Sequence, residues 1–193
     1  HLVEQALSQG HQVTAFARHP EKLGLHDASL RYQAGDVLDS KAVESAVEGH
    51  DAALIALGAG RKGGVRADGT KNVIDAMKQH GVRRLICLST LGAGDSRNLL
   101  NFFWKRIMFG LLLRAAYADH EAQEKLVRQS GLDWTLVRPG AFVDGDATGQ
   151  YQHGAPLPAT GLKLKIARAD LAGFMLRQLT DKGYLHRAPG VTC

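Results

Sequence analysis

Short apolar segments alternate with amphipathic helical patterns along the whole chain, and this alternation limits the possible fold more than any other feature. Strands are predicted at residues 12–18, 30–34, 51–57, 84–89 and 133–138. Helices are predicted within residues 1–10 and at 40–48, 68–80, 116–129 and 169–179. Such alternation is typical of a parallel sheet with helices on both faces, and no repeat or long linker interrupts it. We therefore expect a single domain that spans residues 1–193.

The bulk composition excludes several other classes of protein. Hydrophobic residues make up 45% and charged residues 22% of the chain, as is typical of globular domains. The formal net charge is +5, but the basic residues are scattered and do not alternate with aromatic ones, so we do not expect a nucleic-acid partner. With two cysteines and no visible signal peptide, the chain is expected to be cytoplasmic and free of disulfides.

The most apolar stretch, residues 99–116, does not read as a membrane span because Lys105, Arg106 and Arg114 interrupt it. We interpret it as an amphipathic helix that packs against the core. A cover over the substrate site, a dimer contact and a lipid-surface contact are the alternatives. No membrane span is expected, and the chain is expected to be a monomer or a homodimer.

The predicted order of elements begins with a helix, whereas a Rossmann-type domain begins with a strand and a tight glycine turn. In such domains the glycines let the backbone approach the pyrophosphate of a dinucleotide, and the helix N-terminus faces its negative charge. We therefore expect an α/β fold with a Rossmann-type doubly wound parallel sheet that lacks its first strand and its phosphate loop. A shorter natural variant of this fold is the alternative.

Two basic residues follow the predicted strand at 12–18. Ligands of open parallel sheets bind at the carboxyl ends of the strands, and the side chain that ends this strand contacts the adenine ribose. Arg18 in this place favours the extra phosphate of NADP, and Lys22 lies one turn further along the chain. A solvated surface arginine is the alternative. The expected cofactor is NADP(H).

Small and polar residues follow the next strands. Asp36 and Val37 are placed to frame the edge of an adenine, with a helix cap or a turn as the alternative role of Asp36. The sequence Leu57-Gly58-Ala59 would let the backbone pass close to a ribose or a nicotinamide, or it is a flexible connection.

Candidate catalytic residues follow the strand at 84–89. Ser89, with Thr90 beside it, ends this strand, and its hydroxyl would donate to a substrate carbonyl unless it only caps a turn. A tyrosine followed four residues later by a lysine is the usual proton-donor pair of short-chain reductases, but Tyr117 is followed by Glu121. His120 is a candidate to replace part of that function, or is a surface histidine. We expect no metal site, because the histidines do not cluster with cysteine or carboxylate residues.

Several segments together resemble the atypical short-chain dehydrogenases/reductases, in particular the NmrA-like group and the NAD(P)H-binding proteins similar to flavin reductase (biliverdin-IXβ reductase). The similar segments run through the whole chain: Gln12-Val13-Thr14-Ala15-Phe16-Ala17-Arg18, Gly35-Asp36-Val37, Asp119-His120, residues 130–140 and Asp170-Leu171-Ala172. The family's N-terminal glycine motif is absent, and Ala141 stands where the flavin-reductase branch carries a histidine.

The resemblance implies a role for each of these segments. Arg18 would contact the 2′-phosphate, Asp36 and Val37 would flank the adenine, and Leu57 and Gly58 would line the ribose. It also implies that Ser89 meets the nicotinamide and the substrate, and that the nicotinamide edge lies against Pro139, Gly140 and Ala141.

Two functional hypotheses follow. The first is an NADPH-dependent reductase that transfers hydride to a small planar acceptor such as a flavin or quinone, with Ser89 orienting the acceptor and water or His120 supplying the proton. The second is a non-catalytic protein that binds NADP(H) and reports redox state to a partner.

Overall fold

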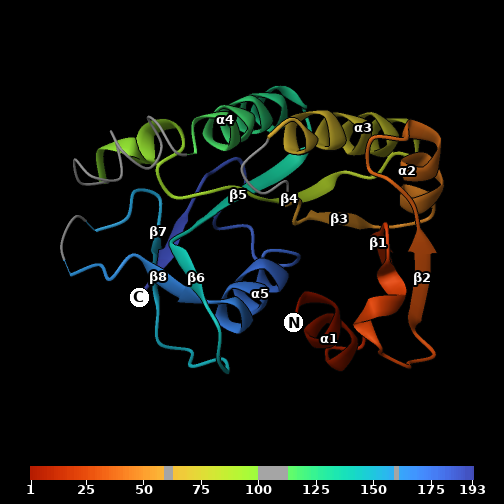
Figure 1. Cartoon of the computed structure of the whole chain (residues 1–193), viewed down its shortest axis with the longest axis horizontal. Helices are drawn as coiled ribbons and strands as arrows, with labels where there is room; N and C mark the ends of the chain where they lie inside the picture. The colour runs from red at the N-terminus through yellow and green to blue at the C-terminus, as the bar shows by residue number, and fades with distance from the viewer. Residues whose placement is uncertain (59–62, 100–112, 159–160) are drawn as a thin grey trace.

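The computed structural model describes residues 1–58, 63–99, 113–158 and 161–193 (Figure 1). Its α-helices are α1 (Leu2–Ser8), α2 (Ser40–Val47), α3 (Val65–Gln79), α4 (Arg114–Gln129) and α5 (Arg168–Arg177). Two short 3-10 helices are η1 (Pro20–Leu23) and η2 (Gly94–Leu99). The strands are β1 (Val13–Ala17), β2 (Leu30–Ala34), β3 (Ala52–Ile55), β4 (Arg84–Leu88), β5 (Asp133–Pro139), β6 (Ala141–Val143), β7 (Gln152–Gly154), β8 (Lys165–Ala167) and β9 (Gly190–Thr192).

The strands form a mainly parallel sheet, which confirms the predicted α/β class and Rossmann-type arrangement. Strands β3, β4, β5 and β9 lie side by side in this order and run parallel, and β7 adds an antiparallel edge beside β9. Strands β1 and β2 form a separate parallel pair, as do β6 and β8. The predicted elements are found with ends that differ by at most three residues. The predicted apolar helix at 99–116 falls mostly outside the described residues.

The sheet is divided between β1 and β3. In Figure 1 β1 lies on the side of β2 that is nearer β3, yet no described strand pairs with the facing edge of either. The apolar run at 51–57 predicts a strand buried on both faces, and this is wrong for β3, in which only Ile55 is fully buried. The reason is its position, because β3 lies at the edge of the five-stranded sheet.

Helices cover both faces of the sheet, with α2, α3 and α4 on one side and α1 and α5 on the other (Figure 1). Side chains of β4 alternate between the two layers, because successive residues of a strand point to opposite faces. Leu85 and Cys87 belong to the core under α2, α3 and α4, whereas Ile86 belongs to the core against α5. The amide of Gln5 in α1 donates to the carbonyl of Ala169 in α5 at 2.9 Å, which joins the two helices of the second layer.

A glycine in α3 joins the separate strand pair to the main sheet. A Cβ at Gly69 would lie 2.7 Å from Val37 Cγ1 and 3.0 Å from Leu57 Cδ1, so the segments that follow β2 and β3 both pack against this position. The side-chain amide of Asn72, one turn further along α3, donates to the carbonyl of Val37 at 2.9 Å. These contacts bring the carboxyl ends of β2 and β3 together.

Substitution of Gly69 by alanine is therefore expected to destabilise the protein by about 1–3 kcal/mol, because the stiff, branched Val37 cannot move away without strain. The measurement is the free energy of unfolding in urea. Gly173 in α5 is the matched control, because a Cβ there would meet only the amide oxygen of Gln5, at 3.2 Å. Gly173→Ala should be neutral or stabilising through helix propensity. Equal effects of the two variants would contradict the role of Gly69.

Candidate functional site

A cavity of about 340 Å³ lies at the carboxyl ends of β3, β4 and β5. This is the edge at which open parallel sheets bind their ligands, and the volume is in the range of small-molecule sites. The structure brings most of the predicted site residues to this cavity, and they line it together: Leu57, Gly58, Ser89, Thr90, His120, Pro139, Gly140 and Ala141. Ala59, predicted to act beside Gly58, lies outside the described residues.

The residues predicted to hold the adenosine end lie apart from this cavity. Arg18 follows β1 and is exposed, without an ion-pair partner in the part of the chain that the structure describes, and Lys22 is exposed in η1. Asp36 is exposed and accepts a hydrogen bond from the amide of Leu38 at 3.0 Å. This contact forms a turn, which is one of the alternatives given above for Asp36. Val37 is half-buried against the core, and its contact with Gly69 places it near Leu57. Their cofactor contacts stay predictions.

Ser89 directs its hydroxyl proton to a buried carboxylate. Ser89 Oγ donates to Glu124 Oε1 at 2.7 Å, and Glu124 also accepts from Arg138 Nε at 2.8 Å and from Arg138 Nη2 at 2.6 Å. Glu124 is 4% and Arg138 1% exposed. Arg138 Nη1 donates to Asp95 Oδ1 at 2.6 Å, and this hydrogen bond lowers the pKa of Asp95. Donation by Ser89 to a substrate carbonyl would require its bond to Glu124 to break.

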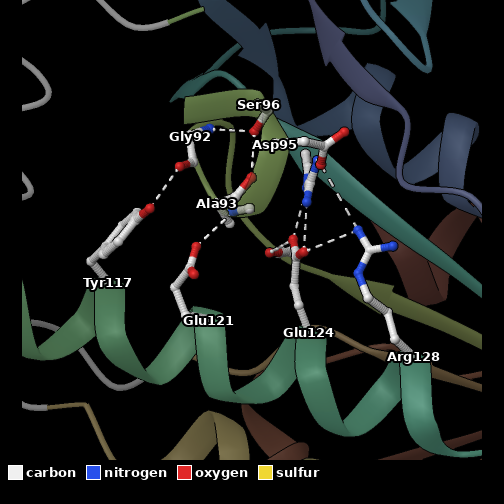
Figure 2. Close-up of polar contacts among 11 residues, drawn as sticks. Gly92, Ala93, Asp95, Ser96, Tyr117, Glu121, Glu124 and Arg128 are labelled. Carbon is white, nitrogen blue, oxygen red and sulfur yellow. Dashed lines mark hydrogen bonds and ion pairs between the residues drawn. The ribbon is translucent and has the colours of Figure 1, made fainter. Parts of the chain in front are cut away.

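One face of α4 holds the loop that follows β4. Figure 2 shows Tyr117, Glu121, Glu124 and Arg128, spaced three or four residues apart, pointing toward residues 92–96. Tyr117 donates to the carbonyl of Gly92 at 3.0 Å, and Glu121 accepts from the amide of Gly94 at 2.6 Å. Tyr117 and Glu121, which stand where short-chain reductases carry their Tyr/Lys pair, therefore anchor a loop. Burial raises the pKa of Tyr117.

His120 lines the cavity as a neutral imidazole. Burial, followed by the positive charge of Arg66, lowers its pKa to about 4. Its Nδ1 atom is buried and has no hydrogen-bond partner among the residues of the described ranges. The cavity is thus lined by an imidazole that is not protonated at neutral pH, and whose Nδ1 atom is buried within the protein.

Arg66 is a cavity residue that the sequence does not predict, and Asp119 is the partner that fixes it. Arg66 lies in the first turn of α3, is 9% exposed and lines the cavity. The carboxylate of Asp119 in α4 accepts from the amides of Arg66 and Ala67 at 3.1 and 3.0 Å, and Arg66 Nη1 lies 3.5 Å from Asp119 Oδ2. Because Asp119 caps α3 from another helix, α3 begins three residues before its predicted start at Asp68. No local pattern around Arg66 indicates this.

Comparison with known proteins identifies the family of this chain. A family model described as NAD(P)H-binding matches residues 1–182. The chain belongs to this NAD(P)H-binding family. It is 30% identical over 143 residues to the UPF0659 protein YMR090W of Saccharomyces cerevisiae, a match that covers 71% of the chain and 60% of that protein. The chain thus spans less than two thirds of the length of the curated relatives that it matches first.

Two solved structures share the fold of this NAD(P)H-binding chain. ChuY, described as an anaerobillin reductase from Escherichia coli O157:H7, is 24% identical with a TM-score of 0.79, and the match covers 99% of this chain and 89% of ChuY. A short-chain dehydrogenase/reductase from Veillonella parvula in complex with NADP is 15% identical with a TM-score of 0.83, and the match covers 100% of this chain and 88% of that one. At these identities the likeness concerns the fold alone.

No described helix is both long and apolar enough to cross a membrane. Within the residues that the structure describes, no three histidine, cysteine, aspartate or glutamate side chains are grouped so that they would hold a metal ion.

Removal of Arg138 is expected to be strongly destabilising, because it leaves the buried carboxylate of Glu124 without its main partner. Arg138→Met should lower the free energy of unfolding by about 3–5 kcal/mol, measured by urea denaturation. Arg83→Met is the matched control, because Arg83 pairs with Asp133 at 3.0 Å on the surface and should contribute far less. A loss as small in Arg138→Met as in the control would contradict a structural role for the buried pair.

The lowered pKa of His120 also predicts a pH dependence of stability. The unfolded chain binds a proton at this residue below about pH 6.5, whereas the folded protein does so only near pH 4, so stability falls as the pH drops through this window. The contribution reaches about 3 kcal/mol. Unfolding in urea at pH 7 and pH 4.5 measures it, and His120→Gln should show a smaller loss on acidification. An unchanged pH dependence in this variant would show that His120 is not the group responsible.

Proposed function

We propose that this chain is an NADPH-dependent oxidoreductase domain that transfers hydride to a small planar acceptor, such as a flavin or a quinone. The observation that carries the proposal is the cavity, because residues from the ends of three parallel strands meet there beside Arg66 and His120. Membership of the NAD(P)H-binding family supplies the class of cofactor. ChuY, which shares the fold, is itself described as a reductase.

The proposed cofactor contacts extend from β1 to β5. Arg18, with Lys22, would bind the 2′-phosphate, because an exposed guanidinium at this strand end matches a phosphate in shape and charge. Asp36 and Val37 would border the adenine. The remaining residues would surround the ribose and the nicotinamide: Leu57, Gly58, Ala59, Ser89, Thr90, Pro139, Gly140 and Ala141.

Bound NADPH would supply the hydride, and the protein would position the acceptor against it. Water is the proposed source of the proton, because a neutral His120 is a poor acid and Tyr117 donates to a backbone carbonyl. His120 would instead contact the ligand as a neutral imidazole that lines the cavity. Such a site suits acceptors whose reduction needs little acid catalysis.

The second candidate is a non-catalytic NADP(H)-binding protein that reports redox state. This candidate is favoured by the lack of a proton donor, because neither candidate catalytic residue of the cavity is free to act as an acid. His120 is neutral, and the proton of Ser89 is donated to Glu124. Absorbance at 340 nm with FMN and with menadione separates the two candidates. Oxidation of NADPH that depends on the protein supports the reductase, and binding without turnover supports the sensor.

Arg18 should determine the preference for NADPH over NADH. Loss of charge-assisted hydrogen bonds to a phosphate corresponds to a change of about 10- to 100-fold in affinity, so Arg18→Ala should bind NADPH more weakly by this factor and NADH equally well. Titration by nucleotide fluorescence measures both. Arg31→Ala is the control, because Arg31 is also exposed, on the adjacent strand β2, and its side chain donates to Gln33. A wild-type chain that binds neither nucleotide would overturn the proposed function.

A further inference from the structure

The cavity wall formed by the ends of β4 and β5 presents hydrogen-bond acceptors to a ligand. Ser89 lines the cavity, whereas its partner Glu124 does not, so the hydroxyl proton of Ser89 points out of the cavity toward α4. A carboxylate that pairs with a guanidinium only accepts hydrogen bonds, which fixes Ser89 as the donor in this contact. Ser89 is 3% exposed, and the hydrogen bonds seen in the described part of the chain do not use the lone pairs of its Oγ atom.

Neighbouring donors on the same wall are also occupied. The hydroxyl of Thr90 donates to the carbonyl of Leu91 at 3.3 Å. The amides of Ser89, Leu91, Gly140 and Ala141 donate to backbone carbonyls at 2.8–3.0 Å. Pro139, which lies between them, has no amide proton. A ligand carbonyl placed here would find most donors already engaged, whereas an N–H group would find a free acceptor.

We infer that Ser89 accepts a hydrogen bond from an N–H group of the ligand, and that Glu124 is the positioning residue that holds it in this role. The inference rests on the proposed function and narrows its substrate class. The N–H group is either the carboxamide of the nicotinamide or a ring N–H of the acceptor, as flavins have and quinones lack. Ser89 therefore does not polarise an acceptor carbonyl.

Glu124 can impose this direction because its own position is fixed. Both of its oxygens are held by Arg138, which is almost wholly buried and is held in turn by Asp95. The hydroxyl of Ser89 could turn toward the cavity only by leaving a buried charged acceptor, and hydrogen bonds to charged groups are among the strongest in proteins.

The first arm of the test compares NADPH with the reduced 3-acetylpyridine analogue, in which a methyl group replaces the amide nitrogen while the carbonyl remains. The wild-type chain should bind NADPH about 5- to 50-fold more tightly than the analogue, because the analogue leaves Ser89 Oγ without a donor. In Ser89→Ala the two dissociation constants should become nearly equal.

The second arm compares FMN with its N3-methyl derivative by flavin fluorescence. If the wild-type chain binds FMN more tightly than the N3-methyl derivative by a similar factor, and Ser89→Ala loses this difference in affinity, Ser89 meets the acceptor. A preference confined to the nucleotide arm would show that it meets the nicotinamide carboxamide. Either result supports the inference, and the absence of discrimination in both arms overturns it.

The positioning role of Glu124 is tested by replacing the buried ion pair as a unit. The double variant Glu124→Leu/Arg138→Met avoids an unpaired buried charge, and such replacements often preserve stability. It frees the hydroxyl of Ser89 to turn, so the preference for the N–H ligand should fall at least threefold. Asp95→Asn is the control, because it weakens the outer contact of Arg138, leaves Glu124 in place and should keep the wild-type preference.

The outcomes separate this inference from the proposed function. No binding of NADPH to the wild-type chain overturns the proposed function. If the wild-type chain binds NADPH and its 3-acetylpyridine analogue with equal affinity, and FMN and its N3-methyl derivative with equal affinity, only the role of Ser89 is overturned. Discrimination that persists in the double variant but disappears in Ser89→Ala keeps the acceptor role and overturns the positioning role of Glu124. If the double variant does not unfold cooperatively on heating, Ser89→Ala alone decides the inference.

Discussion

The buried pair of Glu124 and Arg138 joins three segments that are distant in the sequence and together form one wall of the cavity. Glu124 lies on α4, Arg138 near the end of β5, and their partners Ser89 and Asp95 follow β4. Desolvation makes each buried charge costly by itself, so each is tolerated only while the other is in place. The position of the chain after β4 is thus coupled to the position of α4, and a ligand at this edge meets a wall that is already formed.

Close packing, rather than charge, joins the β1–β2 pair to the rest of the fold. Gly69 lets Val37 and Leu57 approach the same point on α3, and Asn72 fixes the backbone at Val37. No described strand spans the space between β1 and β3, so this contact and the packing of α2 on α3 align the two carboxyl edges. Any ligand that extends from Arg18 to the cavity depends on this alignment.

The sequence predicts the elements well because burial imposes a period that can be read directly. Leu85, Ile86 and Cys87 are buried on two faces and form an unbroken apolar run, and α5 shows its inner face through Leu171, Phe174 and Met175. Positions at strand ends are also predictable, because parallel strands bring them to one edge. Many of the expected residues therefore line the cavity.

The contacts of these residues were not predictable, because they depend on partners far away in the sequence. The proton of Ser89 is directed by a carboxylate 35 positions further on, and α3 is capped by Asp119, more than 50 positions away. No local pattern encodes such pairs, so a serine at a strand end is interpreted as a donor to the substrate even where the fold directs its proton to a buried carboxylate. Burial of His120 beside Arg66 is equally a property of two helices that pack together.

The polarity of the β4–β5 wall, which lies apart from the Arg66 guanidinium on α3, has a chemical consequence for hydride transfer. Reduction of an isolated carbonyl places negative charge on oxygen, and enzymes stabilise that charge with donors aimed at it. On the β4–β5 wall the hydroxyl donors are engaged elsewhere, and His120 is neutral. An acceptor that spreads the incoming charge over a conjugated ring needs less of this help, and an N–H on such a ring matches the lone pairs of Ser89. The arrangement that makes this wall a poor oxyanion site is thus consistent with reduction of a planar nitrogen heterocycle.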